Sequence, residues 1–81
     1  MQKIEIYSPY IKLDSALKFF GSVMSGGEAK EFIQGGEVKV NGEVCLMRGK
    51  KLIPGDIVMF NGEEFTVMNY ESWKARDWEL S

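Results

Sequence analysis

The 81-residue sequence contains no histidine and a single cysteine, Cys45. One cysteine cannot form an internal disulfide, and without histidine a zinc site has no plausible set of ligands. We therefore expect no metal site, and we expect Cys45 to be a buried, reduced thiol that behaves as a small hydrophobic side chain. The lack of histidine also removes the most common general base and its pairs with nucleophiles. We expect no catalytic residues and no cofactor.

Long apolar runs are also missing. No stretch is long enough to cross a bilayer, and the first residues lack the basic region and apolar segment of a signal peptide. These absences predict a cytoplasmic protein with no membrane partner. Apolar residues make up 44% and charged residues 27% of the chain, which is typical of one globular domain. We expect residues 1–69 to form this domain and residues 70–81 to be a polar C-terminal tail.

The net charge of −2 is unfavourable for a protein that binds polyanions, but the charge is segregated along the chain. Residues 12–51 contain seven basic and five acidic side chains, whereas residues 52–81 contain two basic and six acidic ones. The middle of the chain is therefore locally positive although the whole is acidic. Such a local field is sufficient to attract a nucleic acid backbone.

A helical spacing of apolar residues predicts two short helices in the first half of the chain. The first covers residues 15–20, with Asp14 as its expected N-cap and Gly21 at its end. The second starts at a capping box formed by Ser25 and Glu28. The two helices are separated by only a few residues, so they are predicted to pack as a helix-turn-helix.

Alternating apolar and polar residues predict strands elsewhere. The expected elements are an edge strand around Ile4 and Ile6, a hairpin of residues 37–40 and 43–47, a basic loop over residues 48–51, and a second hairpin of residues 57–60 and 64–68. Asn-Gly pairs at 41–42 and 61–62 suit the tight turns of these hairpins, and Pro54-Gly55 suits a type II turn. The predicted fold is α+β: two short packed helices against a small, mostly antiparallel, curled sheet.

Four blocks of sequence, in order, resemble the S-four RNA-binding domain, also called the αL motif and named after a small-subunit ribosomal protein. The blocks are Lys12-Leu13-Asp14, Ser25-Gly26-Gly27-Glu28-Ala29-Lys30, Gly36-Glu37-Val38-Lys39-Val40-Asn41-Gly42-Glu43 and Pro54-Gly55-Asp56-Ile57-Val58. The resemblance covers roughly residues 10–60, and the chain looks most like the stand-alone bacterial YaaA-type members. It implies a domain that docks on structured RNA, ribosomal RNA above all, with a role in ribosome assembly and with ribosomal or other proteins as further partners.

The resemblance places the RNA-binding face on the second helix, the loop before it and the Val-Lys-Val-Asn-Gly strand and turn. By matched position it points to Lys12, Ser25, Lys30, Lys39 and Asn41. Spaced cationic and polar side chains of these types contact the phosphates and 2′-hydroxyls of structured RNA. For the same reason Lys18, Arg48, Lys50 and Lys51 are candidates. Each lysine is equally consistent with an ordinary solvated surface, and Asn41 with a turn residue alone.

Gly26 and Gly27 are a departure from the family pattern, in which Arg or Lys often follows the serine. Glycine would let the backbone amides at the start of the helix approach a phosphate closely, so both residues are candidates as well. The alternative function is a protein-interaction module on the same fold, which would use the acidic residues Glu63 and Glu64 and a tail containing Trp73 and Trp78.

Overall fold

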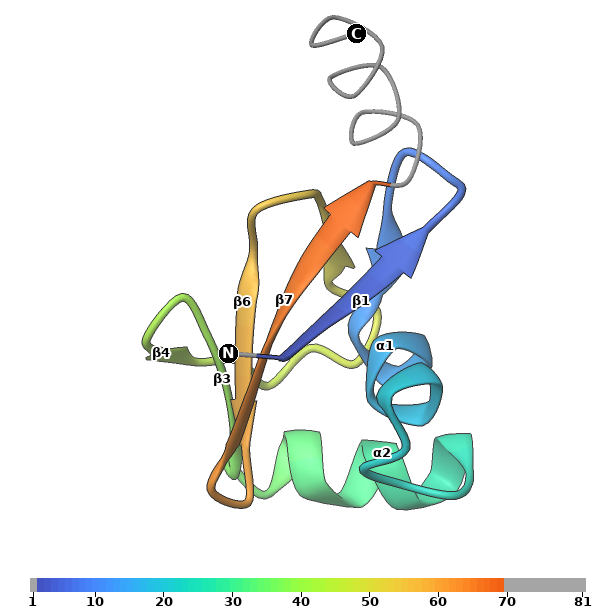
Figure 1. The fold of residues 1–81 in the computed structure, drawn as a ribbon. Coiled ribbons are helices and arrows are strands. Elements are labelled where there is room, and N and C mark those ends of the chain that lie inside the picture. The colour runs from blue at the N-terminus through green and yellow to red at the C-terminus, as the bar shows by residue number, and fades with distance from the viewer. Residues whose placement is uncertain (1, 70–81) are drawn as a thin grey trace, which may run out of the picture.

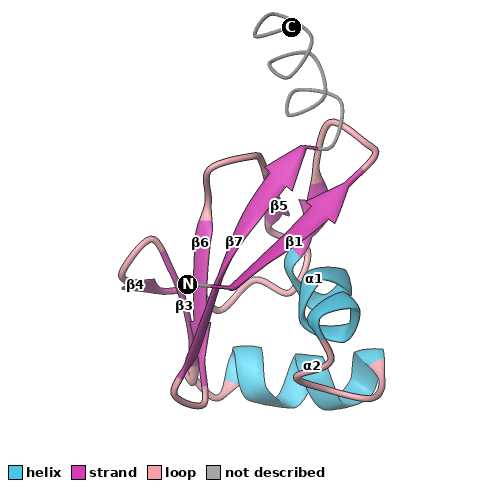
Figure 2. Ribbon diagram, viewed as in Figure 1, coloured by secondary structure: helices cyan, strands magenta, loops and turns pink. Residues whose placement is uncertain are grey.

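The computed structural model describes residues 2–69 (Figure 1). The elements in chain order are β1 (Gln2–Ile6), β2 (Ile11–Lys12), α1 (Leu13–Phe20), α2 (Gly26–Gln34), β3 (Val38–Val40), β4 (Glu43–Val44), β5 (Lys51–Leu52), β6 (Ile57–Phe60) and β7 (Glu63–Asn69). Both helices lie on one side of the main sheet (Figure 2). The α+β class and the helix-turn-helix are thus confirmed. The tail predicted for residues 70–81 lies outside the described residues.

The main sheet has five strands in the order β1-β7-β6-β3-β4. Three of its pairings are antiparallel, and the pairing of β1 with β7 is parallel. The prediction that Ile4 and Ile6 belong to an edge strand is confirmed, because β1 has β7 as its only neighbour in the sheet. The parallel pairing brings residues 2–6 beside residues 65–69, which are far away in the sequence.

A second sheet, of two strands, was not predicted. In it Ile11 and Lys12 of β2 pair with Leu52 and Lys51 of β5. The predicted basic loop over residues 48–51 therefore ends in a short strand. Two-residue strands carry too little alternation for a sequence pattern to reveal them.

The core lies between the helices and the buried face of the main sheet. Its apolar side chains come from both layers: Ile4, Ile6, Leu13, Ala16, Leu17, Val23, Ala29, Ile33, Val38, Val40, Leu52, Val58, Phe60, Phe65 and Val67. Two ring contacts tie the layers together. The rings of Phe20 and Phe65 are stacked with centroids 4.5 Å apart, and those of Phe32 and Phe60 are 4.9 Å apart. Each aromatic pair adds about 0.5–1.5 kcal/mol to the free energy of area burial.

The start of α1 differs from the prediction. Asp14 is not its N-cap; the cap is Lys12, and no side chain forms a capping hydrogen bond there. The Asp14 carboxylate instead accepts a hydrogen bond from the adjacent Ser15 amide. The first amides of α1 donate to main-chain carbonyls of the basic segment 48–51, which comes later in the chain, so a side-chain cap is not needed there.

The other helix boundaries follow the sequence signals. Gly21 ends α1 in the left-handed conformation, with φ of 91°. The Ser25 hydroxyl accepts a hydrogen bond from the Glu28 amide at the start of α2, and Gly35 is the C-cap of that helix. Ser25 is therefore confirmed as the N-cap that the capping box predicted.

Both predicted Asn-Gly turns are present. Asn41 and Gly42 have φ of 53° and 87°, and Asn61 and Gly62 have φ of 54° and 78°. At the third turn Gly55 has φ of 102°, and the Asp56 amide donates to the Ile53 carbonyl, as a type II turn requires.

The returning strand of the first hairpin is shorter than predicted. It ends at Val44 rather than Met47, because β3 offers only three residues to pair with and the Cys45 amide forms a last bond to the Val38 carbonyl. The prediction that Cys45 is buried was wrong, since the side chain is only partly buried and packs against the core without belonging to it.

Candidate nucleic-acid interface

The predicted basic loop folds back onto the start of α1. The amides of Leu13 and Asp14 donate to the carbonyls of Lys50 and Arg48, at 2.9 and 3.1 Å, and the Lys50 amide closes a turn on the Met47 carbonyl. These main-chain bonds fix the loop relative to the helix. The side chains of Arg48 and Lys50 are thereby held next to the N-terminus of α1, although they follow it by more than thirty residues in the sequence.

Pairing of β2 with β5 adds two more cations to this region, because Lys12 and Lys51 are register partners. Like charges directly opposite each other destabilise a sheet, so the pairing of Lys12 with Lys51 lowers the stability of the fold. The Lys51 ammonium lies 4.9 Å from the ring centroid of Tyr10, a cation–π contact that holds it in place. We call Lys12, Arg48, Lys50 and Lys51 the basic cluster.

The side chains of the basic cluster are available to a ligand. All four residues are exposed. Within residues 2–69 the ion pair of Lys3 with Glu5 is the only one formed, so no described carboxylate neutralises the cluster. Exposed cations without a carboxylate partner are available to form charge-assisted hydrogen bonds with phosphates.

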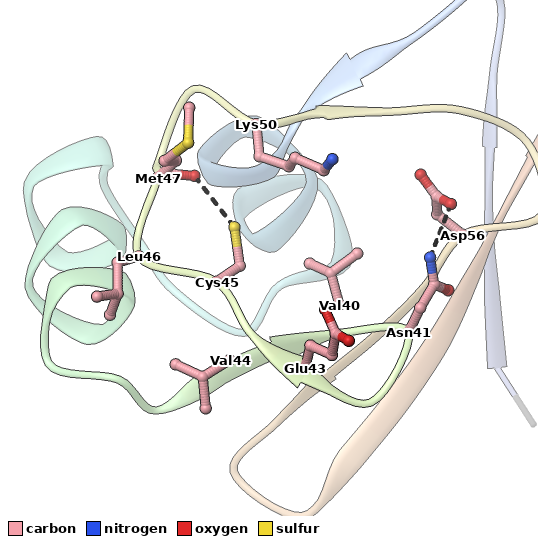
Figure 3. Close-up of a pocket in the computed structure, with 9 residues that line it drawn as sticks. All are labelled: Val40, Asn41, Glu43, Val44, Cys45, Leu46, Met47, Lys50 and Asp56. Atoms are coloured by element: carbon pink, nitrogen blue, oxygen red, sulfur yellow. Dashed lines mark hydrogen bonds between the residues drawn. The ribbon is translucent and has the colours of Figure 1, made fainter.

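A depression of about 360 Å³ adjoins the cluster (Figure 3). It lies between the β3–β4 hairpin and the segment that follows it, and its lining residues are Val40, Asn41, Glu43, Val44, Cys45, Leu46, Met47, Lys50 and Asp56. In Figure 3 the side chain of Lys50 extends from the far segment toward Asn41 and Asp56. Lys50 thus belongs to both the cluster and the depression.

Asn41 has a structural role that its turn position did not predict. Its side-chain carbonyl accepts a hydrogen bond from the Ile57 amide at 2.9 Å, and its side-chain NH₂ donates to the Asp56 carboxylate at 3.0 Å. The other Asp56 oxygen accepts from the Ile53 amide. One side chain therefore ties the hairpin turn to the Pro54-Gly55 turn, and one Asn41 N–H remains for a ligand.

The start of α2 is the second part of the surface. Ser25 is exposed and already engaged as the cap of this helix. A side chain at Gly26 would meet no atom within 4 Å, and one at Gly27 would meet only the Ser25 hydroxyl, at 3.9 Å. Neither position has a positive φ. The fold therefore does not require glycine at either position. Lys30 is exposed on the same helix.

Lys39 occupies a different face of the molecule. Val38 and Val40 point into the core, so the intervening Lys39 points to the sheet face opposite the helices. There it lines a shallower depression together with acidic Glu37 and Glu63. Lys30 and Lys39 are therefore not on one face, whereas their matched positions in the family suggested a shared one. Lys18 is exposed in the last turn of α1.

Only some of the residues expected to form a protein-interaction surface, the alternative function, lie within the described part of the chain. Glu63 is exposed and Glu64 partly buried at the start of β7, whereas Trp73 and Trp78 lie outside the described residues. Among residues 2–69 no cluster of side chains is suited to hold a metal ion, and no helix is long and apolar enough to cross a membrane.

Comparison with known proteins assigns the chain to a family. The model of the S4 domain matches residues 4–68. The chain belongs to the S4 domain family. The match begins before and ends after the span of roughly 10–60 that the sequence blocks suggested, because it includes residues of the paired strands β1 and β7.

Relatives of this S4 domain are found among bacterial proteins. It is 42% identical over 67 residues to a Bacillus subtilis (strain 168) protein named as ribosome maturation protein RlbA. The aligned residues cover 82% of this chain and 94% of the relative. It is 37% identical over 60 residues to YbcJ of Escherichia coli (strain K12), covering 74% of this chain and 86% of the relative.

A solved structure is similar over most of its length. The solution structure of YbcJ from E. coli, described as containing an αL motif involved in RNA binding, matches with a TM-score of 0.66 and 33% identity. It covers 84% of this chain and 87% of YbcJ. The predicted αL RNA-binding fold is therefore confirmed for this S4 domain.

Sequence reasoning missed two parts of the surface. The β2–β5 pairing and the depression beside Asn41 both depend on contacts between segments far apart in the chain. The sequence contained two signals for these parts. Lys12 and the segment 48–51 both carry cations, and the apolar residues between Val44 and Met47 are unusual for a solvated hairpin.

Proposed function

We propose that this S4 domain is a non-catalytic, cytoplasmic RNA-binding protein that docks on structured ribosomal RNA during ribosome assembly. The observation that carries the proposal is the basic cluster. Four cations from two distant segments are held together, unpaired by described carboxylates, on a protein whose net charge is −2. Such a concentration of positive charge against the average of the chain is what recognition of a phosphate backbone requires.

The rest of the proposed surface extends from this cluster. Ser25, Gly26, Gly27 and Lys30 supply the start of α2, and Asn41 supplies a polar group at the margin of the depression. Lys18 and Lys39 would reach RNA only if it wraps around the domain. We expect Lys39 to contribute less than the cluster, because Glu37 and Glu63 share its depression and offset its attraction for phosphate.

Three findings support ribosomal RNA as the target. The family is an RNA-binding family, one relative is named as a ribosome maturation protein, and the similar solved structure is described by its RNA-binding motif. The exposed lysines are consistent with them, since spaced cationic side chains contact the phosphates and 2′-hydroxyls of structured RNA.

The decisive experiment compares two charge reversals that change the net charge equally. Lys51→Glu places a carboxylate opposite Lys12 and so neutralises two cluster cations, whereas Lys3→Glu acts on the open face of the sheet beside Glu5. Filter binding to transcripts of bacterial 16S and 23S ribosomal RNA is measured over a range of salt. We expect Lys51→Glu to weaken binding about tenfold and to lower the salt slope by about one to two.

The control variant, Lys3→Glu, should weaken binding less than twofold. Equal losses for both variants would show that only the net charge matters and would remove the basic cluster from the proposal. Wild-type binding that is absent, or insensitive to salt, would contradict an RNA-binding function altogether. The same titration with poly(U) as competitor measures the preference for structured RNA.

A further inference from the structure

The depression beside the basic cluster has a chemistry that phosphate binding does not need. Val40 and Cys45 form its floor, and both side chains point inward in Figure 3. Its outer margin is formed by Val44, Leu46 and Met47, which are 52%, 57% and 67% exposed, and in Figure 3 the side chains of Val44 and Leu46 point outward, away from Lys50. Three exposed large apolar side chains within four consecutive residues are uncommon on a small soluble domain and usually mark a binding site.

The opposite wall is polar and oriented. Asn41 and Asp56 are fixed by their mutual hydrogen bond and by bonds from the amides of Ile57 and Ile53. After these bonds, Asn41 retains one N–H donor, and each Asp56 oxygen retains acceptor capacity. A donor and an acceptor thus lie side by side, and their hydrogen bonds restrict the conformations of both side chains.

We propose that this depression holds one unstacked nucleobase of the bound RNA, and that the base is one with an exocyclic amino group. A base is flat and apolar on its faces and has donors and acceptors on its edge, which matches an apolar floor with a polar pair at one side. The Asp56 carboxylate would accept from the amino group, and Asn41 would donate to the neighbouring ring nitrogen. The volume of about 360 Å³ lies within the range of small-molecule pockets, about 300–1,000 Å³.

The charged and polar lining favours a nucleotide over an apolar protein side chain as the occupant. Lys50, a member of the basic cluster, lines the depression together with the carboxylates of Glu43 and Asp56, so a base inside would have its phosphate on the Lys50 side. The inference rests on the proposed function and makes it more specific: the cluster holds the backbone, and the depression gives a preference among bases.

The single cysteine makes the depression directly testable. Cys45 is a free thiol in the floor, so an occupant should shield it from alkylation. The rate of its reaction with N-ethylmaleimide is measured with saturating cytidine or adenosine monophosphate, and with ribose 5-phosphate as the matched ligand without a base. We expect the nucleotides to slow the reaction at least threefold and ribose 5-phosphate to leave it unchanged. Uridine monophosphate, which has a carbonyl in place of the amino group, should protect less.

A control variant separates occupancy of the depression from general effects of the nucleotide. Cys45→Ala with Met24→Cys moves the thiol to a fully exposed position, 90% accessible in the native chain, that does not line the depression. Nucleotides should not slow alkylation of this variant. Protection of both thiols, or protection of neither, would overturn the base-binding site, as would equal protection of Cys45 by ribose 5-phosphate.

The outcome can be told apart from that of the proposed function. If ribosomal RNA binds through the cluster while nucleotides leave Cys45 unprotected, the depression does not bind a base and the RNA-binding function stands. A protein side chain would then be the better candidate for the apolar outer margin. If nucleotides protect Cys45 while ribosomal RNA fails to bind, the depression stands and the target must be another nucleotide-containing molecule.

Discussion

Asn41 and Asn61 are both asparagines in the same kind of turn, but their side chains differ in the hydrogen bonds that they form. Both occupy the left-handed region, with φ of 53° and 54°, and both precede a glycine. The Asn41 side chain bonds to Asp56 and Ile57, whereas that of Asn61 forms no hydrogen bond within the described residues. An Asn-Gly pair predicts the turn in each case, but only the three-dimensional arrangement distinguishes the anchored turn from the ordinary one.

This difference predicts unequal effects of the same substitution. Both Asn41→Ala and Asn61→Ala add the strain of alanine at positive φ, but Asn41→Ala also removes two side-chain hydrogen bonds. We expect Asn41→Ala to lower the free energy of unfolding by about 1–2 kcal/mol more than Asn61→Ala, since each such bond contributes about 0.5–1.5 kcal/mol. Urea denaturation followed by circular dichroism measures both. Equal losses would mean that the Asn41 bonds are replaced by water at no cost.

At residue scale, local chemistry was predictable where a side chain acts on its own segment. Ser25 caps the helix that it precedes, and Gly21 ends the helix that it follows. Prediction failed for Asp14, because α1 already begins at Leu13, and the amides of Leu13 and Asp14 donate to carbonyls of Lys50 and Arg48 from the other half of the chain. A short sequence window cannot show such a competitor.

Among the elements, helix α2 has a complete N-cap, which is followed by two glycines that the packing of the domain does not require. Gly26 and Gly27 follow the cap directly, and neither faces a neighbouring side chain or backbone that would exclude a Cβ atom. Packing within this domain therefore does not explain the two glycines. Either another constraint requires them, or no constraint does. Close approach of the helix start to a phosphate would be such a constraint.

Substitution at Gly26 tests which of these applies. If the helix start is near RNA and has room, Gly26→Arg should add one phosphate contact, raise the affinity for ribosomal RNA about three- to tenfold and steepen the salt slope by about one. Gly26→Ala is the control, because it changes helix propensity without adding charge. A fall in affinity for both variants would instead indicate that RNA packs against the bare backbone of Gly26.

The candidate site was predictable as a set of residues but not as a surface. The sequence identified every member of the basic cluster, since Lys12, Arg48, Lys50 and Lys51 are all cations in a locally positive region. It could not show that Lys12 pairs with Lys51, or that Lys39 faces away from the helices, because both depend on strand pairing. Register is a property of two segments together.

For the molecule as a whole, all described elements and the match to the S4 domain end near the same residue. β7 ends at Asn69, and the family model ends at residue 68. The domain boundary predicted at residue 69 stays a prediction. Residues 70–81 add two basic and three acidic side chains, so their removal would change the net charge from −2 to −1.

Truncation after Asn69 should therefore preserve the domain. We expect the shortened chain to unfold in one cooperative urea transition with a midpoint close to that of the full chain, because residues 2–69 bury a continuous apolar core between the helices and the main sheet. Its affinity for ribosomal RNA should rise by up to about threefold, because slightly more acidic than basic charge is removed. A lower midpoint would assign the segment a packing role, and a lower affinity a role in RNA binding.

The parallel pairing of β1 with β7 also has a consequence for the time at which the protein can fold. Residues 2–6 leave the ribosome before the other described elements, yet their partner in the sheet is the last described strand, residues 65–69. Until that strand is synthesised, Ile4 and Ile6 lack the sheet neighbour that they have in the described fold, and the edge of the nascent domain stays open. Such long-range pairing is slow to form and comes late. The helices and the first hairpin can assemble during translation, but the described sheet is completed only after residues 65–69 have been made.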